Sequence, residues 1–278
     1  MKIIPDKLNF LTAGIPSVSK DYSDAFLKLD ELSLDGLEVE FVHGVRYSEN
    51  TRDCILNRKN KLITHHGPYY INLNAKEKDK IEASTKRVLD TCRAAHDLGA
   101  YSITYHAAFY LGDESSVVTK KMIELHNLIN ETLKEENIDV WFRPETTGKR
   151  SQWGTLEEII EVAKNAPNVL PCIDFAHIHA RSNGKYNTYD EFSNILETLA
   201  NALGQEALDN FHGHVAGIEY SDKGEKKHLI FEESDFNYKD LLKALKKFNV
   251  KGALVCESPN IEVDTKILKE YYEHCNGF

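Results

Sequence analysis

The chain has 278 residues, 41% of them hydrophobic and 28% charged, and it carries a formal net charge of −10 at pH 7. These values are ordinary for a globular protein with a sizeable core, and no apolar stretch approaches the ~18 residues of a transmembrane helix, so we expect no such helix. The negative charge argues mildly against a nucleic-acid partner, because phosphate binding rests on Lys and Arg. A local basic rim or bound divalent metals can still reverse the field over one face.

Short apolar runs alternate with longer amphipathic stretches along the whole chain. The short runs predict strands at 8–14, 36–42, 61–67, 102–108, 139–145, 169–177, 211–220 and 252–258. The stretches between them predict helices, with the clearest helical periodicity at 82–100, 119–137, 155–166, 189–203 and 238–248. Two of these helices have a candidate capping residue at the start, Thr155 before 156–166 and Asp113 before 114–122.

Eight strands, each followed by a helix, predict a parallel sheet. Eight such units in ~250 residues match a (β/α)8 TIM barrel, whereas doubly wound open sheets usually have fewer strands. No Pro/Gly/Ser-rich linker divides the chain. We therefore expect residues 1–278 to form a single α/β TIM-barrel domain, with its active site at the C-terminal ends of the strands.

Most of the later strands end in a histidine or a carboxylate. These residues are His65, His66, His106, Glu145, Asp174, His177, His212, His214 and Glu257, and Glu225 and His228 follow in the loop after the seventh strand. One such residue alone is more often a hydrogen-bonded or capping residue. Six consecutive strands that bring imidazoles and carboxylates to one rim need a counter-ion. The histidines of helical segments, His96, His126 and His274, are expected to be structural.

A metal is the most economical counter-ion for this set of side chains. Imidazole and carboxylate ligands without thiolate suit Zn, Mn, Fe or Co. About eight candidate ligands, at three to four per ion, imply two or three ions. No G-x-S-x-G, G-x-G-x-x-G or Walker A motif is present. A glycosidase pair of Glu145 and Glu257 stays open, but it leaves the histidines unexplained.

The five cysteines form no C-x-x-C pair, and Cys172 and Cys256 lie in apolar runs. We expect these two to be small buried hydrophobic residues, and a reducing cytoplasm fits this pattern.

Six motifs, taken in order, resemble the endonuclease IV family (AP endonuclease family 2), within the wider group of xylose-isomerase-like barrels. They are HHGPYYINL (65–73), YHAAFY (105–110), RPETTG (143–148), CIDFAHIHAR (172–181), HVAGIEYSDKGEKKHL (214–229) and CESP (256–259). The resemblance covers nearly the whole chain. The H-x-x-Y-x-I-N-L pattern of the first motif favours endonuclease IV over a sugar isomerase.

This resemblance implies two or three divalent ions, expected to be zinc, with manganese as the alternative. The implied ligands are His66, His106 and Glu145 for the first ion, Glu145, Asp174, His214 and Glu257 for the second, and His177 and His228 for the third. Tyr69 matches the family tyrosine that enters the duplex beside the abasic site. Arg46 is a weaker match to an arginine that fills the DNA stack.

The chain departs from the family at the third ion. The family has Asp-x-His after the seventh strand, whereas here Lys226 precedes His228 at that offset. A cationic lysine cannot ligate, so we expect Glu225, one residue earlier and one methylene longer, to replace the aspartate while Lys226 points away. If both residues are solvated instead, the enzyme uses two ions. His212 competes with His214 as a ligand, but only His214 aligns with the family motif.

The expected activity is that of a metal-dependent AP endonuclease. It would hydrolyse the phosphodiester 5′ to abasic sites in duplex DNA during base excision repair, with Glu145 and Glu257 as catalytic residues. Duplex DNA is then the expected partner, and neither a membrane nor a protein partner is implied. The alternative is a xylose-isomerase-like sugar isomerase or epimerase with one or two divalent ions, although no lysine stands at a strand end for its proton transfer. A metal-binding barrel that binds DNA without cutting it has little support in the net charge.

Overall fold

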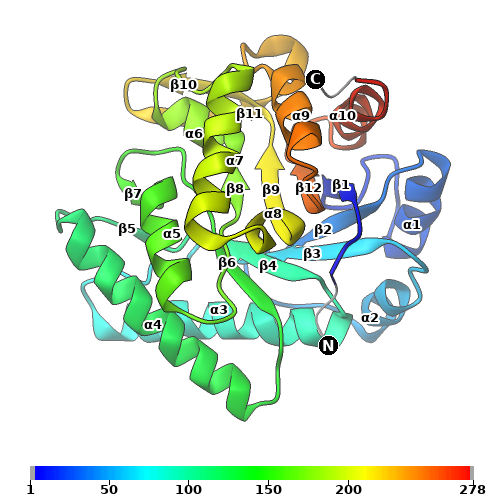
Figure 1. The fold of residues 1–278 in the computed structure, drawn as a ribbon. Helices are drawn as coiled ribbons and strands as arrows, with labels where there is room; N and C mark the ends of the chain where they lie inside the picture. The colour runs from blue at the N-terminus through cyan, green and yellow to red at the C-terminus, as the bar shows by residue number, and fades with distance from the viewer. Residues whose placement is uncertain (1–3, 276–278) are drawn as a thin grey trace.

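The computed structural model describes residues 4–275. Its inner sheet consists of eight parallel strands: β1 (Leu8–Ala13), β2 (Gly36–Glu40), β3 (Leu62–His66), β4 (Ser102–Tyr105), β6 (Trp141–Pro144), β8 (Ile173–Asp174), β9 (Phe211–Val215) and β12 (Gly252–Cys256). They are hydrogen-bonded in the order β6-β4-β3-β2-β1-β12-β9-β8 (Figure 1). Each strand lies within a run predicted from the sequence.

The sheet closes on itself between β6 and the segment that leads into β8. Parallel bridges join Phe142 to Val169 and Glu145 to Cys172. The Cys172 amide donates to the Pro144 carbonyl at 3.1 Å, and the Cys172 carbonyl accepts from a backbone amide just after β6 at 3.0 Å. Closure of the ring confirms the TIM-barrel fold over the open sheet.

Helices alternate with the strands and surround the barrel (Figure 1). They are α1 (Tyr22–Glu31), α2 (Glu49–Leu56), α3 (Lys78–Leu98), α4 (Ser115–Glu135), α5 (Leu156–Asn165), α6 (Phe175–Arg181), α7 (Tyr189–Leu203), α8 (Glu206–Asp209), α9 (Tyr238–Lys247) and α10 (Glu262–His274), with a 3₁₀ turn η1 (Phe231–Glu233). Thr155 and Glu158 form a capping box at the start of α5, as the sequence predicts for Thr155. Helix α4 begins after Glu114 instead of Asp113.

The predicted strand 169–177 is wrong in its last three residues. The Asp174 carboxylate accepts a hydrogen bond from the His177 amide at 2.7 Å and thereby caps α6. The strand therefore ends at Asp174, and His177 lies in the first turn of a helix.

The predicted strand 211–220 divides into two strands. After β9 ends at Val215, β10 (Gly217–Ser221) leaves the barrel and pairs antiparallel with β11 (Gly224–Leu229). This hairpin lies beside α6 (Figure 1), and it places His228 on a strand instead of in a loop. A second small antiparallel pair joins β5 (Ala108–Phe109) to β7 (Gln152–Trp153).

The outer and inner faces of the barrel strands differ in chemistry. Phe10 and Leu254 pack outward against the helices, while the alternating Leu11 and Val255 belong to a separate cluster with Tyr101. The buried polar side chains of the strands include Glu38, Thr64, Ser102, Thr104, Arg143, His212 and His214. TIM-barrel interiors are usually filled by branched apolar residues, so this polar interior beneath the rim requires an explanation.

The cysteines are free, and Cys172 and Cys256 are buried as expected. Within residues 4–275 no helix is both long and apolar enough to cross a membrane. That residues 1–278 form one domain stays a prediction.

Candidate metal centre

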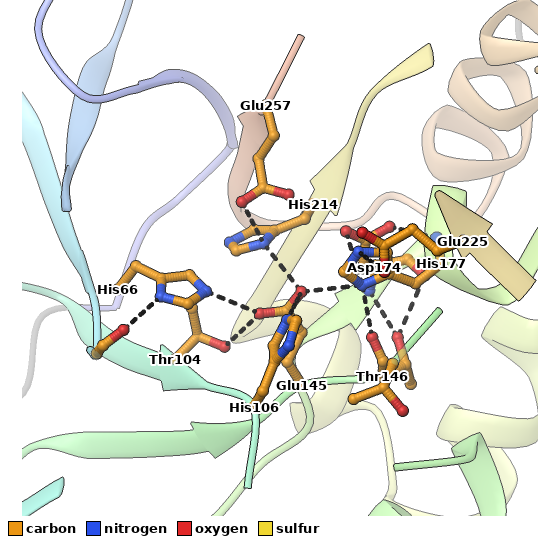
Figure 2. A network of polar contacts seen from close by, with 12 residues as sticks. His66, Thr104, His106, Glu145, Thr146, Asp174, His177, His214, Glu225 and Glu257 are labelled. Atoms are coloured by element: carbon orange, nitrogen blue, oxygen red, sulfur yellow. Dashed lines mark hydrogen bonds and ion pairs between the residues drawn. The ribbon is translucent and has the colours of Figure 1, made fainter. Parts of the chain in front are cut away.

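Glu145, directly after β6, lies at the centre of an imidazole cluster at the C-terminal rim of the barrel (Figure 2). Its carboxylate oxygens lie 3.2 to 3.4 Å from ring nitrogens of His66, His106, His177 and His214. These four histidines come from separate segments of the chain. They meet because the C-terminal ends of all barrel strands share one rim.

Two further carboxylates extend the cluster. Glu257, directly after β12, places Oε1 3.4 Å from Nδ1 of His214, and Oδ2 of Asp174 lies 3.2 Å from Nδ1 of His177. Ligand-type atoms lie within 4.8 Å of one another in several overlapping groups, among them His66, His106 and Glu145; Glu145, Asp174, His214 and Glu257; and Asp174, His177 and His228. The structure thus brings together the side chains that the sequence predicts for two ions and most of a third.

Backbone carbonyls orient three of the imidazoles. The Nδ1 atoms of His66, His177 and His228 lie 2.7, 2.9 and 3.3 Å from the carbonyl oxygens of Gly67, Thr146 and Glu257, respectively. Because a carbonyl only accepts, each Nδ1 is the donor of these contacts, and Nε2 is the nitrogen left to bind a metal. Nε2 of His177 then faces Nε2 of His228 at 3.5 Å. Metal-ligating histidines are usually oriented in this way.

The carboxylates and imidazoles shift each other's pKa values. Burial raises the pKa of Asp174 to about 6. Burial acts in the same direction on Glu145, but the charges of His214 and His106 outweigh it and hold that pKa well below its usual range. Burial opposes protonation of His177, yet Asp174 and Glu145 raise its pKa well above the ordinary value. A divalent cation bound here would displace the protons that balance these carboxylates.

Several buried ligand-type atoms have no hydrogen-bond partner within the described part of the chain. They include Oε1 of Glu145, Oδ2 of Asp174, both ring nitrogens of His214, Oε2 of Glu257 and both carboxylate oxygens of Glu38. Buried polar atoms are rarely left in this state. Carboxylate oxygen and imidazole nitrogen are donors that Zn and Mn accept, so the buried cluster fits divalent metal ions.

The β10–β11 hairpin carries the two remaining predicted ligands, Glu225 and His228. The strand register shifts within the hairpin, so that Lys226 is opposite no residue of β10 and forms a β-bulge. Residues three apart point to opposite faces of a regular strand. The bulge returns Glu225 to the face of His228, and its Oε2 lies 3.5 Å from Nε2 of His177. The bulge, more than an additional methylene, therefore accounts for the reach of Glu225.

The bulge also decides where the neighbouring lysine points. Lys226 is exposed on the opposite face of the hairpin, where its Nζ contacts Glu219 at 3.0 Å. The expectation that Lys226 points away from the cluster is confirmed. On the inner face, Gly148 makes room for Glu225, because a Cβ at Gly148 would lie 2.6 Å from the Cβ of Glu225 and 3.0 Å from Cδ2 of His177.

A cavity of about 310 Å³ opens over the cluster. Its lining consists of His66, Tyr69, His106, His177, Glu225, His228 and Glu257. Tyr69 is 59% exposed at this mouth, and its ring centroid lies 5.9 Å from that of His66. Arg46 is exposed in the loop between β2 and α2 and does not line the cavity. DNA binding by Tyr69 and Arg46 stays a prediction.

Two glutamates of β2 also lie in this region. Both are missed when only the residues at strand ends are considered. Glu38 is fully buried and lies 3.0 Å from Nε2 of His214 and 3.1 Å from Nε2 of His212. Glu40 has a buried Oε1 without a partner among residues 4–275, and burial raises its pKa to about 8. The signal is present in the sequence: carboxylates two positions apart in the apolar run GLEVE point to one face of a strand.

Comparison with known proteins places the chain in a family. The family model described as "Xylose isomerase-like TIM barrel" matches residues 26–274. An uncharacterized protein of Methanocaldococcus jannaschii is 40% identical over 266 residues, which cover 95% of this chain and 97% of that protein. An apurinic-apyrimidinic endonuclease of Caenorhabditis elegans is 29% identical over 156 residues, which cover 54% of this chain and 38% of the endonuclease.

Solved structures share the fold at low sequence identity. A D-tagatose 3-epimerase-like protein superposes with a TM-score of 0.71 at 22% identity, covering 95% of this chain and 97% of its own. Endonuclease IV from Thermus thermophilus superposes with a TM-score of 0.70 at 14% identity, covering 96% of this chain and 100% of its own. At these identities the likeness concerns the fold alone, and it does not separate an endonuclease from an epimerase.

Proposed function

The chain belongs to the xylose isomerase-like TIM barrel family, and from this premise we propose that it is a metal-dependent AP endonuclease that hydrolyses the phosphodiester 5′ to abasic sites in duplex DNA. The observation that carries the proposal is the number of ligand-type side chains around Glu145, which form several overlapping groups. One ion takes about four protein ligands, so the cluster exceeds what one ion uses. The similarity to the nematode apurinic-apyrimidinic endonuclease supports the same activity.

The proposed metal ligands follow three of these groups of side chains. His66, His106 and Glu145 would hold one ion; Glu145, Asp174, His214 and Glu257 a second; and His177, His228 and Glu225 a third. Zinc suits this donor set, and manganese is the alternative. Asp174 also lies within reach of His177 and His228, so the third ion would have carboxylates on two sides.

Bound divalent ions would make a water molecule acidic enough to lose its proton near neutral pH and would stabilise charge on the phosphoryl oxygens. Glu257 lines the cavity with a partly exposed side chain, so it can accept a hydrogen bond from the attacking water and orient it toward phosphorus. Tyr69 stands at the mouth, where it would lie against the duplex beside the lesion. An abasic nucleotide enters such a cavity at low cost, because no base has to be unpaired.

Exposed cations around the rim support a nucleic-acid substrate despite the overall charge. They lie in the loop after β2, the loop after β6 and the β10–β11 hairpin, and they are Arg46, Lys149, Arg150 and Lys223. Together with divalent ions in the centre, they would give this end of the barrel a field that attracts phosphate.

A sugar isomerase or epimerase is the second candidate. One observation favours it: Glu145, Asp174, His214 and Glu257 form a single four-ligand group that contains two glutamates suited to proton transfer. No lysine lines the cavity among the described residues, and the remaining imidazoles would have no task in a one-ion enzyme.

The two candidates are separated by one pair of assays on the same zinc- or manganese-loaded protein. The first uses a labelled duplex with a single tetrahydrofuran abasic analogue, with the undamaged duplex as control, and the second uses a panel of ketoses and aldoses. We expect cleavage 5′ to the analogue and no sugar turnover, with metal content above one ion per chain. Sugar turnover without cleavage of the duplex would overturn the proposal in favour of the epimerase.

A further inference from the structure

His214 differs from its neighbours in how it is oriented. His66, His177 and His228 each have a backbone carbonyl at Nδ1. His214 instead has a carboxylate at Nε2, because Oε1 of Glu38 lies 3.0 Å from that nitrogen. Both side chains are fully buried.

Glu38 joins His214 to His212 in a polar series of four residues that crosses the barrel. Its second oxygen, Oε2, lies 3.1 Å from Nε2 of His212, and Nδ1 of His212 lies 2.8 Å from Oγ of Ser102. The four residues come from β2, β9 and β4, and none of these three strands is hydrogen-bonded to another of them. The contacts therefore pass through the interior of the barrel, beneath the cluster at the rim.

This series has one consistent arrangement of protons when the imidazoles are neutral. The oxygens of Glu38 approach Nε2 of His212 and Nε2 of His214 at ion-pair distance and not in aligned hydrogen bonds. An ionised carboxylate repels a nitrogen lone pair and attracts an N–H, so the nitrogens that face Glu38 both carry hydrogen. His212 then has its lone pair on Nδ1, where the Ser102 hydroxyl donates. His214 likewise has its lone pair on Nδ1, which lies 3.4 Å from both Glu145 and Glu257.

A metal ion bound beneath the rim, between Cys172, His212 and His214, explains these contacts less well. Cys172, His212 and His214 have ligand-type atoms within 4.8 Å of one another. Both nitrogens of His212 already face a partner, Ser102 and Glu38. His212 therefore has no nitrogen left for an ion unless the contact with Glu38 is broken.

We propose that Glu38 is a positioning residue that fixes the tautomer of His214, so that Nδ1 is the metal-binding nitrogen. This inference rests on the proposed metal centre. Partners of this kind orient a ligating imidazole and raise its basicity, and their loss typically weakens metal binding by about 10- to 100-fold.

The test is zinc binding by the full chain, measured by competition with a chromogenic chelator for the wild type and for Glu38→Met, which removes both acceptor oxygens at similar length. We expect zinc binding to weaken by about 10- to 100-fold in the variant. The matched control is Thr64→Val. Thr64 is the register partner of Glu38 on the neighbouring strand β3, and its buried hydroxyl has no hydrogen-bond partner among the described residues. Zinc affinity should be unchanged in the control.

Circular dichroism separates positioning from a purely structural role. A lower melting temperature of Glu38→Met with unchanged zinc affinity would overturn the inference and leave the metal centre intact. Absence of zinc binding by the wild type would overturn both. If Glu38→Met does not fold, ¹⁵N imidazole spectra of the zinc-loaded wild type decide the matter: hydrogen on Nε2 of His214 supports the inference, and hydrogen on Nδ1 contradicts it.

Discussion

Two buried histidines, one at the rim and one between the barrel and α4, have opposite environments. His126 on α4 has Nδ1 2.6 Å from the Met122 carbonyl and Nε2 2.7 Å from the Tyr105 hydroxyl, and burial lowers its pKa to about 4. His177 is equally buried, but the carboxylates of Asp174 and Glu145 raise its pKa well above the ordinary value. Burial alone therefore does not identify a functional histidine. The partners at its two nitrogens do.

Buried carboxylates show the same contrast. Glu158 in α5 accepts from the hydroxyls of Tyr110 and Ser115 and from two backbone amides, so its oxygens are satisfied by neutral donors. Glu145 faces four imidazoles, and its Oε1 has no hydrogen-bond partner within residues 4–275. The first arrangement is complete without a metal, whereas the second suits a shared cation.

The largest effect is expected from a substitution of Glu145, the carboxylate at the centre of the imidazole cluster. Glu145→Gln keeps the side-chain volume but removes the charge shared by two proposed ions, so abasic-site cleavage should fall by about 10³-fold and metal content should drop. Glu158→Gln is the matched control. It should keep metal and activity and lose only stability, by about 1–3 kcal/mol, from an impaired capping network. Equal metal content in Glu145→Gln and wild type, measured by elemental analysis, would contradict the assignment.

Glu257→Gln should lower cleavage by about 10²-fold while the fold stays intact. The glutamine keeps the size of the side chain but loses the charge that holds the metal and orients the attacking water. Single-turnover rates at saturating zinc or manganese are the measurement. Rates near those of the wild type would assign Glu257 a structural role instead.

The structural histidine, His126, is tested by the pH dependence of the free energy of unfolding. The pKa of His126 is about 4 in the folded chain against 6.5 for the unfolded group, so the unfolded state takes up the proton first as pH falls. Stability should therefore be lost between pH 6.5 and pH 4, by about 2 kcal/mol between pH 7 and pH 5. Urea unfolding of His126→Phe should show a flatter pH dependence than the wild type, whatever its stability at pH 7. Identical slopes would contradict the prediction.

The smallest expected effect concerns the third ion. Glu225→Gln should lose about one ion per chain, since it leaves His177 and His228 with only Asp174, a carboxylate that also belongs to the second group. Added zinc or manganese should restore the rate. Lys226→Gln on the opposite face of the same bulge is the control and should keep its metal. If both variants keep metal content and rate, Glu225 is not a ligand and the enzyme uses two ions.

Much of this organisation is predictable from local patterns. The alternation of apolar runs and amphipathic stretches predicts eight βα units, and Thr155 predicts the start of α5, because both depend on neighbours within a few residues. Polar residues at strand ends predict the cluster around Glu145, because barrel topology carries every strand end to one rim. The predicted strand boundaries are wrong where two local preferences compete. At Asp174 the capping hydrogen bond ends the strand, although the apolar residues that follow would continue it.

The sequence by itself determined the barrel and the kinds of side chain at its rim, since periodicity and strand ends are written in the order of the residues. Tertiary structure alone decided which of them face each other. The bulge at Lys226 depends on the register between β10 and β11, and it places Glu225 beside His177. The contact between Glu38 and His214 crosses the interior between strands that are not neighbours, so it exists only once the barrel has closed.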